Sequence, residues 1–117
     1  MYNATKYLRL SYTSDRANES DSIANQRKYI DEFVKRNPDI KIVNEQLDDG
    51  YSGIVFDRPA FKAMLEDIKS GKINCIIVKD LSRLGREYNE TFTYLRRVFP
   101  ALGVRFIAIN DNIDTAK

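Results

Sequence analysis

The sequence predicts an α/β fold of three layers, with a mostly parallel central sheet of about four to five strands flanked by helices. Strand-like and helix-like segments alternate along the chain, which is the order that builds a parallel sheet with right-handed crossovers. Residues 72–79 enclose the longest apolar run, as expected of a central strand covered on both faces. With 117 residues and 43% hydrophobic composition, the chain can form one core, so one domain is expected over residues 1–117.

Four segments have the apolar patterns of strands, at residues 7–11, 40–47, 72–79 and 104–109. In the first, alternation points Tyr7, Arg9 and Ser11 to one face of the strand, and Leu8 and Leu10 to the other. A guanidinium is therefore expected beside a hydroxyl. Taken alone, this pattern is more often a structural strand with a serine at its exit.

Three segments place apolar residues at helical spacing. Ser20 or Ser22 caps the first helix, which stops at Pro38. The second begins with Pro59 at its first helical position and ends at Gly71. The residues expected on the inward faces of the three helices are Ile23, Ile30, Phe33 and Val34, then Phe61, Met64, Leu65 and Ile68, then Tyr88, Phe92, Leu95, Val98 and Phe99.

The segments 12–21, 48–53, 80–86 and 110–114 are expected to be loops. The glycines of 48–53 are expected to need left-handed backbone. The third helix follows segment 80–86 and is closed by Pro100 and Gly103. Because the carboxyl ends of parallel strands meet at one edge of a sheet, the residues that follow the strands should lie near one another. These residues are Ser11, Asp49, Asp80 and Arg83.

The composition excludes several kinds of chemistry. The chain has no histidine, which removes the commonest general base and transition-metal ligand, so catalytic triads and zinc sites are excluded. The many carboxylates leave a magnesium site conceivable. The single cysteine, Cys75, lies in an apolar run and is interpreted as a core residue. The net charge is only +2, but ten of the nineteen basic residues are arginine, the side chain suited to two-point phosphate contact.

Four arginines are expected near the ends of strands and helices: Arg9, Arg58, Arg83 and Arg86. Each alone would be interpreted as a surface charge or a salt-bridge partner. Together they would repel one another unless an anion lies among them, and a phosphodiester in a dianionic transition state fits that requirement. Without the anion we expect the arginines to lie apart. With Ser11 as nucleophile the arrangement suggests phosphoryl transfer, whereas no glycine-rich phosphate loop supports nucleotide hydrolysis.

Five motifs carry these residues, in this order: Tyr7-x-Arg9-x-Ser11, Ser22-Ile23-x-x-Gln26, Asp49-Gly50-Tyr51-Ser52-Gly53, Arg58-Pro59-x-Phe61 and Asp80-Leu81-Ser82-Arg83-Leu84-Gly85-Arg86. Together they resemble the catalytic domain of the serine recombinases, the resolvase/invertase family, over nearly the whole chain. The last motif and the long loop after Ser11 are most similar to the large serine recombinases, which include integrases and transposases of mobile elements.

The resemblance implies that Ser11 attacks a DNA phosphate, forming a 5′-phosphoserine linkage and releasing a 3′-hydroxyl. It implies that the phosphate is surrounded by Arg9, Arg83 and Arg86, and that Arg58 and Gln26 support the site. No metal or other cofactor is implied, because the phosphoserine bond conserves the energy of the broken diester. The implied partners are double-stranded DNA and further copies of the chain, as a homodimer that assembles into a tetramer.

Two features depart from the family pattern. Ser82 stands where many small members have aspartate, so an acidic role at this position is not implied, and Asp80 is not automatically its substitute. The chain also stops soon after the last expected strand, where the family has an oligomerisation helix and DNA-binding domains. We therefore expect residues 1–117 to be the catalytic domain of a longer protein.

Two alternatives stay open. The chain could be a flavodoxin-like or receiver-type module that binds a phosphate or small ligand without catalysis, with Asp80 as acceptor, although Arg83 and Arg86 beside it disfavour magnesium binding. It could also be an inactive recombinase homologue that acts in DNA assembly. No membrane span or signal peptide is recognised, so a cytoplasmic protein is expected.

Overall fold

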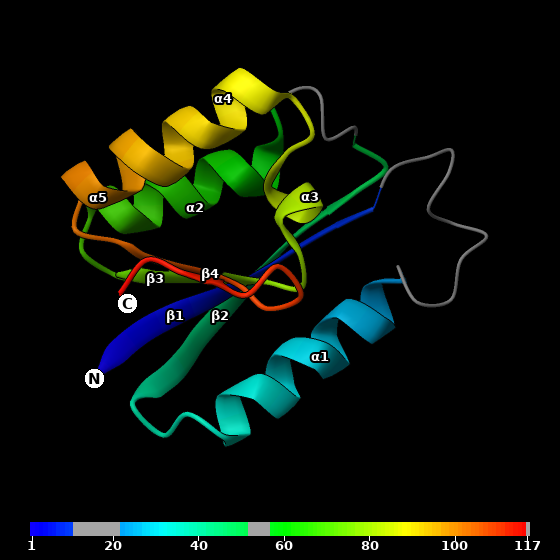
Figure 1. The fold of residues 1–117 in the computed structure, drawn as a ribbon, viewed down its shortest axis with the longest axis vertical. Coiled ribbons are helices and arrows are strands. Elements are labelled where there is room, and N and C mark those ends of the chain that lie inside the picture. Colours follow the sequence, from blue (N-terminus) through cyan, green and yellow to red (C-terminus); the bar gives the residue numbers. More distant parts are fainter. Residues whose placement is uncertain (11–21, 52–56, 117) are drawn as a thin grey trace.

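The computed structural model describes residues 1–10, 22–51 and 57–116. They form one five-stranded sheet in the order β2-β1-β3-β4-β5 (Figure 1). The parallel strands are β1 (Tyr2–Leu10), β2 (Ile40–Asp49), β3 (Cys75–Val78) and β4 (Arg105–Ala108). Strand β5 (Ile113–Asp114) pairs antiparallel with β4 and forms one edge of the sheet.

Helices cover both faces of this sheet, which confirms the predicted three-layer α/β fold (Figure 1). Helix α1 (Ile23–Lys35) lies on one face. The other face carries α2 (Pro59–Lys69) and a continuous helical segment made of α4 (Tyr88–Thr93), the π-helical turn η2 (Tyr94–Val98) and α5 (Phe99–Ala101). A short helix, α3 (Leu81–Leu84), follows β3.

Two hydrophobic cores fill the space between these layers. The alternation predicted for β1 is confirmed, because Tyr7 belongs to the core that contains Phe61 of α2, whereas Leu8 belongs to the core that contains Ile30 of α1. Cys75 is fully buried in this second core, as predicted for a core residue, and burial raises the pKa of its thiol to about 12. The two faces of β1 thus point to different surroundings, and Arg9 shares the face of Tyr7.

Local signals in the sequence place the helix starts correctly. The Ser22 hydroxyl accepts a hydrogen bond from the Asn25 N–H at 3.1 Å, so Ser22 is the N-cap of α1. Pro59 is the first residue of α2, as predicted. Gly50 has φ of 91°, the left-handed backbone expected in its segment.

Three predictions about elements are wrong. The expected loops 80–86 and 110–114 contain α3 and β5, which at four and two residues are too short to show a period. Tyr88, expected to face inward, is 70% exposed. Tyr88 is the first residue of α4, and Phe92 one turn later is the first residue of this stripe that packs against the core, so the predicted stripe begins one turn too early.

Strand β2 also extends two residues beyond its predicted end, to Asp49.

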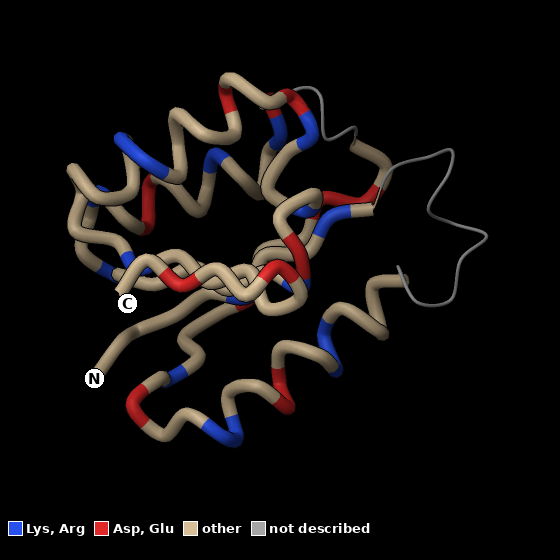
Figure 2. The backbone as a smooth tube through the Cα atoms, in the orientation of Figure 1, with Lys and Arg blue, Asp and Glu red and all other residues tan. Residues whose placement is uncertain are grey.

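Basic and acidic residues are interspersed along the helices of both layers (Figure 2). Among the described residues, no helix has the length and hydropathy needed to cross a membrane.

Candidate active site

The carboxyl end of β1 brings together four of the six residues predicted for the site. Arg9, Arg58 and Gln26 are fully buried, and Arg83 is only 2% exposed. They come from β1, the start of α2, the first turns of α1 and α3. Ser11, the predicted nucleophile, lies outside the described residues and immediately follows Leu10, the last residue of β1.

Arg9 reaches two segments that are distant in the sequence. Its Nε donates to the Arg83 carbonyl at 3.1 Å and its Nη2 to the Ser82 carbonyl at 2.6 Å. Its Nη1 donates to the Tyr51 carbonyl at 2.9 Å. All three acceptors are neutral, so they fix the guanidinium in place without cancelling its charge.

Arg83 completes a reciprocal contact between α3 and β1. Its Nη1 donates to the Arg9 carbonyl at 2.9 Å, and its Nη2 to the Ser82 hydroxyl at 3.2 Å. The Ser82 hydroxyl in turn donates to the Asp80 carboxylate, which lies 3.4 Å from Arg83 Nε. The short helix that carries Arg83 is held at its start by Asp111, whose carboxylate accepts from the Leu81 N–H at 2.5 Å.

Arg58, at the start of α2, binds the same short helix α3. Its Nη2 donates to the Leu84 carbonyl at 2.5 Å, and its Nη1 donates to the Tyr7 hydroxyl at 3.1 Å and to the Arg83 carbonyl at 3.4 Å. The guanidinium carbon also lies 5.7 Å from the centre of the Tyr7 ring and 5.1 Å from that of Phe61. Arg58 therefore joins α2 to β1 and α3.

Asp48 is a residue of this network that the sequence analysis missed, because it was assigned to a loop. Its carboxylate accepts from the Tyr7 hydroxyl at 2.7 Å and from the N–H groups of Ala60 and Phe61 at 2.9 and 3.0 Å. It thus caps α2, whose own N-cap residue is Arg58 and makes no side-chain cap. The missing cap was the available signal: a helix that starts without a capping side chain needs an acceptor from elsewhere.

Gln26 binds the backbone of Arg9 from the opposite side. Its Oε1 accepts from the Arg9 N–H at 3.3 Å, and its Nε2 donates to the Arg9 carbonyl at 3.0 Å. One amide side chain thus offers the donor and acceptor that a neighbouring strand would offer. This pair fixes the beginning of α1 against the end of β1.

Burial dominates the electrostatics of the cluster. It lowers the pKa of Arg9 to about 10, with smaller contributions from the positive charges of Arg83 and Arg58. Burial likewise lowers the pKa of Arg58, opposed by the nearby Tyr7 and Asp48. The expectation that the arginines lie apart without an anion is wrong, because carbonyl oxygens and the carboxylates of Asp48 and Asp80 hold them together.

Arg86, the sixth predicted residue, differs from the other arginines because its side chain is exposed. It lies close enough for its charge to lower the pKa of Arg9. We therefore distinguish the buried arginine cluster, which is Arg9, Arg58 and Arg83, from Arg86 at its margin.

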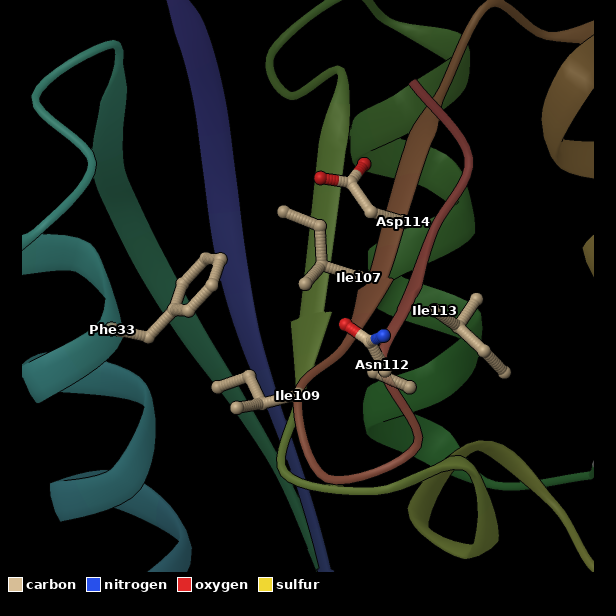
Figure 3. Close-up of a pocket in the computed structure, with 7 residues that line it drawn as sticks. Phe33, Ile107, Ile109, Asn112, Ile113 and Asp114 are labelled. Carbon is tan, nitrogen blue, oxygen red and sulfur yellow. The ribbon is translucent and has the colours of Figure 1, made fainter. Parts of the chain in front are cut away.

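A separate cavity of about 340 Å³ lies on the other side of the sheet, beside β5 (Figure 3). Phe33, Ile107 and Ile109 line it with Asn112 and Asp114. Asp114 is paired with Arg105 at 2.6 Å, so its carboxylate is engaged in the fold. Among the described residues no group of three or more cysteines and carboxylates is placed to hold a metal ion.

Fold and site together define a three-layer α/β domain with a positively charged site at the carboxyl edge of its sheet. The family model for the N-terminal domain of resolvases matches residues 4–117, so the chain belongs to the resolvase family. This membership confirms the resemblance inferred from the five motifs and leaves the receiver-type alternative without support. No curated protein sequence matches the chain.

Solved structures agree with this assignment. The N-terminal catalytic domain of TP901-1 integrase is 25% identical with a TM-score of 0.85, over 98% of this chain and 82% of that one. A resolvase family site-specific recombinase from Streptococcus pneumoniae is 30% identical with a TM-score of 0.78, over 100% and 78% of the two chains. A serine recombinase from Sulfolobus solfataricus is 27% identical with a TM-score of 0.71, over 94% and 69%.

Proposed function

We propose that this protein is a serine recombinase, which cuts and rejoins double-stranded DNA at specific sites through a covalent phosphoserine intermediate. The observation that carries the proposal is the buried arginine cluster at the end of the strand that leads directly into Ser11. The names of the similar proteins, an integrase and site-specific recombinases, support the same conclusion.

In the proposed reaction, the Ser11 oxygen attacks the scissile phosphorus and a bond forms between them. The bond from phosphorus to the 3′-oxygen breaks, the serine loses its hydroxyl proton and the 3′-oxygen gains one. The number of phosphodiester-type bonds is unchanged, so the reverse step can join a new 3′-hydroxyl without an energy source. We propose that this step needs no metal and no other cofactor.

The arginines would stabilise the charge that develops on the phosphate. Arg9 is held by neutral carbonyl oxygens, so its positive charge remains effective in a low-dielectric site. The charge of Arg83 is partly offset by the Asp80 carboxylate, 3.4 Å from its Nε. Arg86 is exposed and would meet the phosphate from the margin. Arg58 and Gln26 would act by holding the other groups in position, since both bind residues of the cluster.

At the level of the assembly, we propose that residues 1–117 are the catalytic domain of a longer chain that forms dimers and then tetramers on DNA. In the family, exchange follows rotation of subunits within the tetramer. We further propose that the protein is related to the large serine recombinases.

The proposal is tested with the full recombinase on a nicked duplex that traps the cleaved state, in the presence of EDTA. Mass spectrometry should find a 5′-phosphate on Ser11, and Ser11→Ala should form no adduct while binding the duplex as tightly as the parent. Ser70→Ala, an exposed serine at the end of α2, is the control and should cleave normally. DNA binding without an adduct on any serine would favour the inactive homologue that acts in DNA assembly.

A further inference from the structure

A groove of about 250 Å³ opens between α3 and α4, beside the arginine cluster. We call it the Tyr88 groove; its lining includes Ser82, Gly85, Arg86, Tyr88, Thr91 and Phe92. Ser82 belongs to both features, because its carbonyl accepts from Arg9 and its hydroxyl from Arg83. The groove thus adjoins the proposed phosphate site at Ser82.

One wall of the groove is an aromatic surface held in place by neighbouring side chains. The Tyr88 ring lies 4.7 Å from the Phe92 ring, centre to centre, at an angle of 44°. The guanidinium of Arg96 lies 5.0 Å from the centre of the same Phe92 ring. Tyr88 itself is 70% exposed, so much of its surface faces outward. An exposed aromatic next to arginines is the arrangement on which nucleic-acid bases stack.

The groove is also lined by Thr91, whose buried hydroxyl group has an unused capacity for hydrogen bonding. Thr91 is 3% exposed, and its hydroxyl oxygen has no hydrogen-bond partner among the described residues. A buried hydroxyl without a partner costs free energy that a ligand atom can recover. The occupant should therefore combine apolar surface with a hydrogen-bonding oxygen or nitrogen.

The charges at the rim favour an anionic occupant. Arg86 is exposed there, whereas the acidic Glu87 is engaged by the helix, since its carboxylate accepts from the Asn89 and Glu90 N–H groups at 3.2 and 2.6 Å. An exposed guanidinium thus lies at the rim, and the neighbouring carboxylate is turned toward the start of α4.

We propose that the Tyr88 groove holds the nucleoside that adjoins the scissile phosphate, with its base on Tyr88 and a polar atom on the Thr91 hydroxyl. Arg86 would contact the phosphate between the groove and the arginine cluster. This inference rests on the proposed function, and adds to it a site that grips one nucleotide of the strand being cut.

The test measures the rate of adduct formation by the full recombinase on the trapped duplex. Two further duplexes lack the base on one or the other side of the scissile phosphate. Tyr88→Ala should slow the reaction about tenfold on the intact duplex, the usual scale of one base stacked on one aromatic ring. One of the abasic duplexes should slow the parent by the same factor, and on that duplex Tyr88→Ala should have no further effect. Tyr29→Ala, a partly exposed tyrosine on α1, is the control and should behave as the parent.

A second variant separates ligand binding from folding. Thr91→Val removes the hydroxyl but keeps the shape of the side chain, so it should lower the reaction rate severalfold and leave the melting temperature unchanged or raised. A lowered melting temperature with an unchanged rate would overturn the assigned role of Thr91.

The remaining outcomes are distinct. In one outcome the parent forms an adduct, but Tyr88→Ala slows adduct formation by the same factor on the abasic duplexes as on the intact duplex. The groove then does not hold the base, and only this inference fails. If Tyr88→Ala changes the oligomeric state with no dependence on the base, the groove is a contact between copies of the chain and the inference also fails. If the parent forms no adduct at all, the proposed function fails with it.

Discussion

Main-chain oxygens are the principal acceptors of the buried arginine cluster. Six hydrogen bonds from Arg9, Arg58 and Arg83 end on five main-chain carbonyls, because Arg9 and Arg58 share the carbonyl of Arg83. A carbonyl attracts a guanidinium without forming a neutral ion pair. The site therefore stays positive while its geometry is fixed, which is the combination needed to receive a phosphate.

Arg83→Lys tests whether geometry matters beyond charge. A lysine keeps the charge but cannot reach the Arg9 carbonyl and the Ser82 hydroxyl as a planar group does. We expect a loss of about 10²–10³ in the rate of cleavage, the usual cost of removing one preorganised donor to a transition state. The unfolding midpoint in urea is measured in parallel. Arg97→Lys, at an exposed position of η2, should cleave as the parent does; near-normal cleavage by Arg83→Lys would contradict the role.

Asp48→Asn tests the cap supplied from β2. The carboxylate accepts three hydrogen bonds, and an amide in its place turns an N–H₂ group toward at least one donor. We expect a loss of about 2 kcal/mol of unfolding free energy, measured by urea denaturation. Asp57→Asn, an exposed carboxylate just before the same helix, should change stability by less than about 0.5 kcal/mol. Equal losses in the two variants would show that Asp48 acts only through charge at the start of the helix.

For individual side chains, the sequence predicts which ones come together in the site. It says less about the atoms to which each one forms hydrogen bonds. The motifs identified Arg9, Arg58, Arg83 and Gln26, and the structure brings them together. Asp48 was missed because a carboxylate after a strand resembles a loop residue, and its partners in α2 adjoin it only in three dimensions. The reciprocal contact of Arg9 and Arg83 was also beyond sequence reasoning, since it depends on carbonyls that every residue possesses.

At the scale of elements, α1 is fastened to the sheet at two places. Gln26 binds the end of β1, and Arg27 forms a two-point ion pair with Glu45 of β2, with both nitrogen–oxygen distances at 2.8 Å. The hydrogen bonds from Arg27 lower the pKa of the Glu45 carboxyl, with a further contribution from Lys6. The second place is partly exposed, so its contribution to stability is small.

Arg27→Ala should reveal this contribution through its pH dependence. Because the pKa of Glu45 is lower in the folded state, the stabilisation is present above the usual glutamate pKa and is lost as pH falls through the folded value. We expect the variant to lose about 0.5 kcal/mol near neutral pH and nothing in strong acid, measured by urea denaturation across pH. Lys28→Ala, exposed on the same helix, is the control; a deficit for Arg27→Ala that persists in acid would point to lost packing instead.

Sequence reasoning located the elements that are long enough to show a periodic pattern, together with β3 and β4, which lie in apolar runs. Helices α1 and α2 and strand β2 span ten or more residues each, and their caps and alternation were recognisable. Helix α3 and strand β5 were missed because they exist through partners: Asp111 holds the start of α3, and Arg105 holds Asp114 of β5. Such contacts form only in the folded molecule and produce no periodic pattern in the sequence.

For the molecule as a whole, the buried positive charge predicts stabilisation by anions. An anion that binds only the folded protein and is present at about ten times its Kd adds about 1.4 kcal/mol. For a domain of this size this raises the melting temperature by about 4–8 °C. The measurement is a thermal melt in increasing phosphate, compared with chloride at equal ionic strength. A rise that follows the logarithm of the phosphate concentration above the Kd indicates a site. A rise that stays linear in concentration, or is equal in chloride, would contradict one. Arg86→Gln should weaken the response, because its guanidinium is the exposed one.

The internal bonding of the arginine cluster has an evolutionary consequence. Arg9, Arg58 and Arg83 connect β1, α2 and α3 to one another, so losing any of them would weaken the fold as well as any chemistry. A descendant that ceased to cut DNA would still be selected to keep these three residues, for as long as it had to fold. Its loss of activity would be recorded instead at position 11 and at the exposed Arg86. When members of this family are sorted into active and inactive, those two positions should be the informative ones.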